Sequence, residues 1–162
     1  MRVIGIDPGL ATIGLGVVDS LGPDDLRVVE WLTIETKPGA LGSRLKEIRT
    51  DLSDYIKKLK PDLAVVEKIF FAINERTAID VAHARGVILE TIASRSLPII
   101  EPTPLELKSS LTGDGQADKR QMQDMLKLLL KIEEIPRPDD AADALGLAVF
   151  GALYHKKRTM LA

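Results

Sequence analysis

Short apolar runs and longer amphipathic segments alternate along the chain in an order that predicts its fold. The first apolar run, residues 3–6, stops at the Asp-Pro-Gly turn signal of residues 7–9. Residues 11–20 and 26–36 are rich in small, β-branched and aromatic side chains, and the Gly-Pro pair at 22–23 separates them. Three consecutive strands joined by turns predict an antiparallel meander.

The apolar period then changes from that of a strand to that of a helix. From residue 43 the apolar positions recur at helical spacing until Pro61, which predicts an amphipathic helix of about four turns. Another short apolar run follows and ends at Glu67. A strand that follows such a helix is expected to lie parallel to the first strand. A second long helix over residues 74–94 and a short fifth strand within 97–102 complete the pattern.

The last third of the chain is predominantly helical. Pro104 can open a brief helix, and a polar, glycine-containing loop then leads into a helix over about residues 117–131. The final helix begins after Pro136 and Pro138, with Asp139 as its expected N-cap. We therefore expect an α/β fold. Its five-stranded mixed sheet has an antiparallel meander of strands 1–3, followed by parallel strands 4 and 5, and is flanked by helices.

Length and composition favour one globular unit. With 162 residues, 45% of them hydrophobic, the chain can bury a single core, and we expect one domain over residues 1–158 followed by a short tail, 159–162. No run approaches the roughly 18 apolar residues of a membrane span, and the N-terminus lacks the layout of a signal peptide. These features predict a cytoplasmic protein that does not associate with membranes.

Residue usage narrows the possible chemistry. The chain has no cysteine and two histidines, which excludes disulfides and thiolate sites and disfavours an imidazole zinc site. Any metal would be a hard cation on oxygen ligands. The net charge of −2 argues mildly against a nucleic-acid partner, yet basic residues concentrate in 108–131 and 156–158, so a local basic face remains compatible with the composition.

Four acidic residues stand where the predicted elements would bring them together. Asp7 and Glu67 end two strands that should be parallel, and such strand ends meet at one edge of a sheet. Asp140 and Asp143 are spaced i, i+3 in the first turn of the last helix and share a face. Singly, each acid is explained as well by a turn, a salt bridge or a solvated surface. Together they predict a site for a pair of Mg²⁺ or Mn²⁺ ions.

Four segments resemble the RuvC family of Holliday junction resolvases, in the same order and with similar spacing over nearly the whole chain. They are GIDPG, VEKIFFAIN, ARG and DDAADALGLAV. GIDPG alone is a weak signal, because actin-type and sugar-kinase ATPases and other RNase H-like nucleases begin similarly. The resemblance implies an RNase H-like fold, a homodimer and Mg²⁺-dependent paired nicking of a four-way DNA junction. It places Asp7, Glu67, Asp140 and Asp143 on the family's acidic positions.

The resemblance also implies cofactors and DNA contacts. Two Mg²⁺ ions would occupy each active site, with Mn²⁺ able to substitute, and Asp7 is the best candidate for a bridging ligand. The family places lysines near Lys108 and Lys119, and these two, with Arg120 close by in the sequence, would contact DNA phosphates; ordinary solvated side chains are the alternative, chiefly for Arg120. Phe70 would stack on an unpaired base, although its neighbour Phe71 could do so instead. Branch-migration motor proteins are partners by resemblance only.

Two further questions stay open at the level of sequence. The helix over 74–94 is the candidate dimer interface, through Ala78, Val81, Ala82 and Arg85, but the same stripe could simply cover the sheet. The alternative functions are another RNase H-like nuclease acting on RNA or other branched DNA, and a non-catalytic junction-binding module. An actin-type ATP-binding protein is disfavoured because 162 residues leave no room for a second lobe.

Overall fold

The computed structural model describes residues 1–22, 25–68 and 75–161, and its strands form one five-stranded sheet with the order β3-β2-β1-β4-β5. The strands are β1 (Arg2–Asp7), β2 (Thr12–Gly22), β3 (Asp25–Glu35), β4 (Leu63–Val66) and β5 (Ile99–Ile100). The first three pair antiparallel, while β4 is parallel to β1 and β5 is parallel to β4. The predicted mixed sheet is confirmed.

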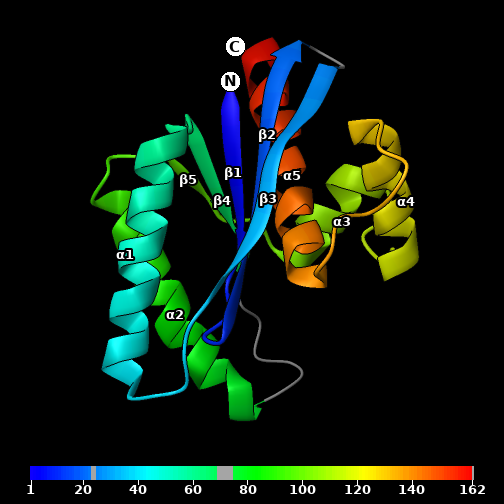
Figure 1. Ribbon diagram of the computed structural model, residues 1–162. Helices are drawn as coiled ribbons and strands as arrows, with labels where there is room; N and C mark the ends of the chain where they lie inside the picture. The colour runs from blue at the N-terminus through cyan, green and yellow to red at the C-terminus, as the bar shows by residue number, and fades with distance from the viewer. Residues whose placement is uncertain (23–24, 69–74, 162) are drawn as a thin grey trace.

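Within the described residues, five helices cover the two faces of this sheet. They are α1 (Leu41–Leu59), α2 (Glu75–Ala93), α3 (Pro104–Thr112), α4 (Lys119–Leu130) and α5 (Asp139–Leu161). In Figure 1, α1 and α2 lie on one side of the sheet, and α3, α4 and α5 lie on the other. Each side has its own hydrophobic core: Ile4 and Ile88 belong to the first, and Val65 and Leu145 to the second.

The start of α5 differs in one respect from the sequence prediction. Asp139 is the first residue of the helix rather than its N-cap. The residue before it, Pro138, has the carbonyl oxygen that accepts hydrogen bonds from the main-chain N–H groups of Ala141 and Ala142. Because Pro138 takes the position just outside the helix, the Asp139 side chain is left to interact elsewhere, and it accepts a hydrogen bond from Lys119.

The main chain of α5 lies directly against the sheet at positions that have no side chain. A Cβ atom placed on Gly14 of β2 would lie 1.9 Å from the carbonyl oxygen of Asp140, and one on Gly5 of β1 would lie 2.0 Å from that of Ala144. Both distances are far inside van der Waals contact. Glycine at these two positions therefore sets how closely the first turns of α5 approach β1 and β2.

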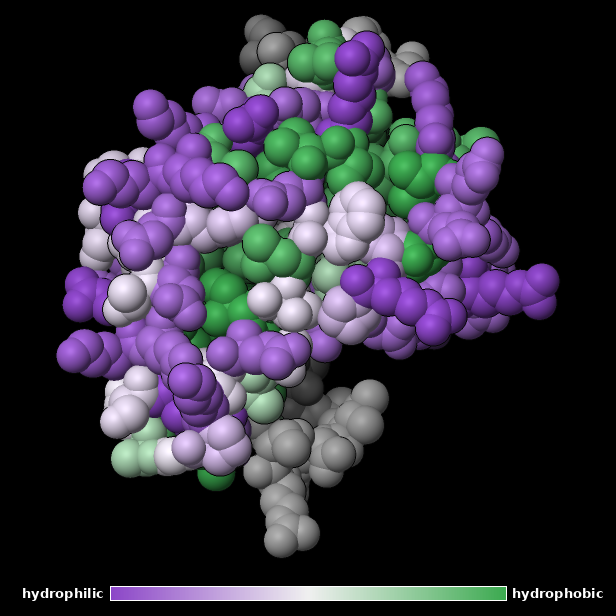
Figure 2. Space-filling model, viewed as in Figure 1, coloured by the Kyte–Doolittle hydropathy of each residue, from purple (hydrophilic) through white to green (hydrophobic). Residues whose placement is uncertain are grey.

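The edge of the sheet that β3 forms is less completely covered. Figure 2 shows apolar residues gathered in the middle and upper part of the face over β2, β3 and α5, between hydrophilic flanks. The exposed large apolar side chains on β2 and β3 are Leu21, Val29 and Trp31.

No helix within residues 1–22, 25–68 and 75–161 combines the length and apolar character that a bilayer span requires.

The contact between α5 and the sheet predicts a specific sensitivity to side-chain size. We expect Gly14→Ala to lower the free energy of unfolding by about 2 kcal/mol or more, because the Asp140 carbonyl must move to admit a methyl group. The control is Gly42→Ala in α1, where nothing lies within 4 Å of the added Cβ. That variant should change stability by less than about 1 kcal/mol. Urea unfolding of both proteins measures the difference, and equal midpoints would contradict the tight-contact explanation.

Candidate active site

The carboxyl ends of β1 and β4 and the N-terminal turns of α5 meet at one end of the sheet. Ile6 pairs with Val66 in the parallel ladder, so the residues that follow them, Asp7 and Glu67, leave the sheet side by side. A pocket of about 270 Å³ opens at this point between the sheet and helices α3, α4 and α5. Its polar lining consists of Asp7, Glu67, Lys108, Lys119, Gln123 and Asp143. Three of the four predicted carboxylates thus share one pocket.

Asp7 is the most strongly perturbed of these acids. Burial, followed by the neighbouring charges of Asp143, Asp140 and Glu67, raises its pKa from 3.8 to about 7, whereas Lys119 opposes the shift. The charge of Asp140 thus also acts on Asp7, although Asp140 is not part of the pocket lining. Structure and electrostatics therefore bring together all four acids that the sequence singled out.

Glu67 and Asp143 are perturbed in the same direction. Burial and the charge of Asp143 raise the pKa of Glu67, and Lys108 lowers it. Asp143 is exposed as a residue, but burial of its carboxyl group is the main cause of its raised pKa. The charge of Lys119 lowers this pKa, as it does for Asp7. Such a group of partly buried like charges is unfavourable by itself and is relieved by protons or by a cation.

Two lysines accompany the acids, and each comes from a different helix. Lys108 lies on α3 and lines the pocket beside Glu67. Lys119 is the first residue of α4, and its Nζ donates a 2.6 Å hydrogen bond to Asp139 at the start of α5. This ion pair joins the N-terminal ends of the two helices at the mouth of the pocket. The structure therefore brings two of the four predicted DNA contacts into the site.

Of the other two predicted DNA contacts, Arg120 lies in the part of the chain that the structure describes. Arg120 has a side chain that is 91% exposed, and it lies 3.9 Å from Asp124 on the same helix, away from the pocket lining. Its role as a DNA contact stays a prediction. Phe70, with its alternative Phe71, lies outside the described residues.

The apolar wall of the pocket was not singled out from sequence, because it forms only when α3, α4 and α5 pack together. It includes Leu107, Met122, Leu126 and Leu147.

Arg85 was assigned from sequence to an interface stripe, but its side chain reaches the active-site end of the sheet. Its Nε donates a 2.9 Å hydrogen bond to the main-chain oxygen of Glu67. A charged residue in a helical stripe that is otherwise apolar was the signal that could have identified it. Ala82, by contrast, is exposed on α2, while Ala78 and Val81 are half-buried. The four residues therefore do not form one exposed surface.

The donor chemistry of the site suits a hard divalent cation. Four carboxylates offer the oxygen ligands that Mg²⁺ and Mn²⁺ prefer, and they come from three separate segments. In the part of the chain that the structure describes, no three acidic or histidine side chains are arranged to hold a metal ion without moving. Closing around an ion would thus require side-chain rotation, for which the open mouth of the pocket leaves space.

The strand order, the mixed strand directions and the helices on both faces define a fold of the RNase H-like class. The model of the family "Crossover junction endodeoxyribonuclease RuvC" matches residues 3–151, and the chain belongs to this family. The RuvC protein of Caldicellulosiruptor saccharolyticus is 45% identical over 150 residues, which cover 92% of this chain and 90% of that protein. The RuvC protein of Halothermothrix orenii is 46% identical over 151 residues, 92% of this chain and 90% of its own.

Solved structures agree with this assignment. Thermus thermophilus RuvC superimposes with a TM-score of 0.91 at 31% identity, covering 98% of both chains. The structure of T. thermophilus RuvC in complex with Holliday junction substrate gives a TM-score of 0.90, also at 31% identity, covering 98% of this chain and 97% of that one. The yeast mitochondrial Holliday junction resolvase Ydc2, at 14% identity and a TM-score of 0.66, shares the fold.

The raised pKa of Asp7 predicts how the metal-free protein responds to pH. The ionised form of Asp7 is disfavoured in the folded state, so its carboxyl contributes stability below about pH 4 that is lost as the pH rises through about 7. Asp7→Asn should therefore raise the Tm at pH 8 in the presence of a chelator by roughly 3 °C or more, since ~1 kcal/mol shifts a domain of this size by about 2–4 °C.

The same substitution should have little effect below about pH 4, where Asp7 is protonated in both the folded and the unfolded chain. Asp124→Asn, which removes an exposed carboxylate of α4, serves as the control and should leave the Tm nearly unchanged at either pH. Thermal unfolding followed by circular dichroism measures all three proteins. An Asp7→Asn variant that is no more stable than wild type at pH 8 would contradict the proposed electrostatic cost.

Proposed function

We propose that the chain is a divalent-metal-dependent endonuclease that resolves four-way DNA junctions by paired symmetric nicks, as in homologous recombination and DNA repair. The observation that carries the proposal is the group of partly buried carboxylates and two lysines in one pocket, in a chain of the RuvC family. The similarity to T. thermophilus RuvC, whose structure holds a Holliday junction substrate, supports the choice of substrate. A non-catalytic module would have no need for such a self-repelling cluster.

Asp7, Glu67, Asp140 and Asp143 would hold two Mg²⁺ ions, with Mn²⁺ as a substitute. Bound ions of this kind lower the pKa of an attacking water and stabilise the leaving 3′ oxygen. Asp7 extends from the central strand β1 and is coupled electrostatically to the other three acids, which favours it as the ligand shared between ions. Because its pKa is about 7, Asp7 must release a proton before it can serve as a ligand near neutral pH.

The two lysines would act on the phosphate that is to be cut. Lys108 is half-buried beside Glu67, where its ammonium group can offset negative charge that develops on the phosphate. Lys119 would exchange its bond to Asp139 for a phosphate oxygen, and this exchange is cheap because both side chains are more than half exposed. Arg120, exposed one position further along α4, would contact the DNA backbone outside the pocket, and Phe70 would stack on a base at the crossover.

A homodimer is part of the proposal, because two symmetric cuts in a two-fold junction require two active sites related by a two-fold axis. The outward face of α2 supports this arrangement. Ile79 is 63% exposed there, and Ala82 and Gly86, one and two turns further along, are exposed as well. A stripe of small and apolar residues lets two helices approach closely. This face replaces the earlier stripe, from which Arg85 must be removed.

The decisive test is a nicking assay on synthetic four-way junctions with Mg²⁺. Wild type should nick the junction, whereas Asp7→Asn and Asp143→Asn should lower the rate by about 100-fold or more, since each removes a charged oxygen ligand. Asp124→Asn should keep the wild-type rate. Linear duplexes and RNA–DNA hybrids of the same sequence complete the design. Comparable cutting of hybrids would identify an RNA-processing nuclease, and junction binding without cutting would identify a non-catalytic module.

The dimer is tested separately by sedimentation. Wild type should sediment with the mass of two chains at micromolar concentration, whereas Ile79→Glu should sediment as one chain, because it places a charge in the proposed contact. That variant should make single rather than paired nicks. Leu128→Glu is the matched control, since Leu128 is 70% exposed on α4 and lies on another surface. A wild-type monomer, even with junction present, would rule out the paired-cut model.

A further inference from the structure

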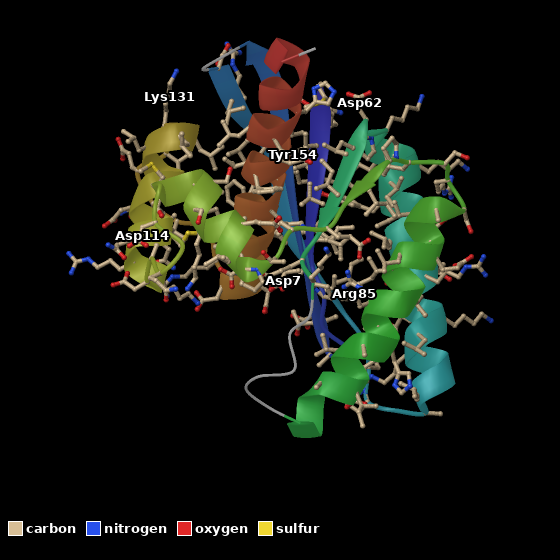
Figure 3. The ribbon with its side chains drawn as sticks, turned by 180° about the vertical axis from the view of Figure 1, so that it is seen from behind. Asp7, Asp62, Arg85, Asp114, Lys131 and Tyr154 are labelled. Atoms are coloured by element: carbon tan, nitrogen blue, oxygen red, sulfur yellow. The ribbon has the colours of Figure 1, made fainter. Side chains whose placement is uncertain are left out.

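Arg85 connects α2 with the main chain of Glu67. Its side chain is only 16% exposed, its Nε donates to the Glu67 carbonyl oxygen at 2.9 Å, and its Nη2 donates to the carboxylate of Glu101, which follows β5. Figure 3 shows Arg85 extending from α2 toward the end of the sheet where Asp7 lies. One guanidinium group thus joins three segments that are distant in the sequence: a helix and the residues just beyond two parallel strands.

The Glu67 carbonyl needs this partner because it lies beyond the strand ladder. β4 has four residues, and its pairing ends at Val66 toward β1 and at Val65 toward β5. A main-chain oxygen in a half-buried position requires a hydrogen bond from elsewhere. On the other side of the same peptide unit, the N–H of Lys68 donates to the oxygen of Pro102 at 2.9 Å. The Glu67–Lys68 peptide is therefore held at both of its polar atoms.

The contribution of Arg85 is one of geometry rather than of charge on the Glu67 carboxylate. Its positive charge is paired with Glu101, and its bond to Glu67 goes to the main chain. The cation that lowers the pKa of the Glu67 side chain is Lys108. The main chain of α2 at Arg85 is itself held in place, because the nearby helix residues Ala84 and Ile88 are completely buried. A planar guanidinium group presents its donors at fixed angles, which lysine cannot reproduce.

We propose that Arg85 is a positioning residue, which holds the Glu67 main chain, and through it the Glu67 carboxylate, in the orientation that the metal site requires. This inference rests on the proposed function. Residues that orient a metal ligand without touching the ion typically change metal affinity by 10–100-fold when they are replaced. Arg85 meets this description through the Glu67 peptide, and Glu101 supports it by fixing the other end of the guanidinium group.

The test compares Arg85→Met, Arg85→Lys and wild type by Mn²⁺ binding, measured by electron paramagnetic resonance. Arg85→Met should bind Mn²⁺ about 10-fold more weakly, and Arg85→Lys should recover part of the loss, since an ammonium group can satisfy one of the two acceptors. Arg49→Met is the matched control. It removes an exposed ion pair between Arg49 of α1 and Glu90 of α2, the helix that also carries Arg85, and the variant should bind Mn²⁺ like wild type. In the junction assay, kcat should fall for Arg85→Met while KM stays nearly constant.

A metal-free measurement separates this proposal from the function on which it rests. The Lys68 amide should exchange with solvent at least several-fold faster in Arg85→Met than in wild type or Arg49→Met, because its peptide loses one of two anchors. Should Arg85→Met fail to fold, Glu101→Gln replaces it, and it should bind Mn²⁺ about 2- to 3-fold more weakly by loosening the guanidinium group.

The outcomes have separate meanings. If wild type binds no Mn²⁺, or Glu67→Gln binds it as well as wild type does, the metal site and the positioning role are both wrong. If those two proteins behave as expected while Arg85→Met, or Glu101→Gln in its place, matches wild type in Mn²⁺ affinity and in exchange of the Lys68 amide, only the positioning role is wrong. Equal losses in Arg85→Met and Arg49→Met would also overturn it, since they would reflect a general weakening of α2.

Discussion

The main chain of α5 touches the main chain of the sheet, and this contact depends on two positions that have no side chain. Gly14 lies directly across the β1–β2 ladder from Asp7, and the carbonyl oxygen of Asp140 occupies the space where a Cβ of residue 14 would be. The same close packing continues at Gly5 against Ala144. The start of α5 is thus brought to the end of β1, and its acidic first turn is held near Asp7. Replacing either glycine would move the helix and separate the carboxylates.

Bringing the acids together has an energetic cost that the rest of the fold must offset. Burial and like charges raise the pKa of Asp7 to about 7, and they shift Glu67 and Asp143 in the same direction. The large apolar cores on both faces of the sheet supply the compensating stability. Lys108 and Lys119 reduce the repulsion only in part. An arrangement that is unfavourable for folding and specific in its geometry is typical of a functional site.

The sequence was sufficient to predict features that depend on the order and spacing of residues along the chain. Period and turn signals located the strands and helices, and the rule for parallel strand ends placed Asp7 beside Glu67. The failures arose where neighbours in space decide. Asp139 was expected to cap α5, but the carbonyl of Pro138 takes that position. The position of Arg120 outside the pocket lining follows from helix geometry, since successive helix residues point about 100° apart; its role as a DNA contact stays a prediction.

Arg85 shows why the direction of a helical side chain cannot be read from periodicity alone. A stripe defines a face, but what lies under that face depends on packing, and here it is the main chain of Glu67, just beyond β4. The helix consequently has two different sides, with Arg85 directed at Glu67 and with Ile79, Ala82 and Gly86 directed outward. A second chain bound to the outward side would contact α2, the same helix whose Arg85 holds Glu67. Assembly and the geometry of the metal site would then depend on each other, because a helix anchored by buried residues moves as a unit.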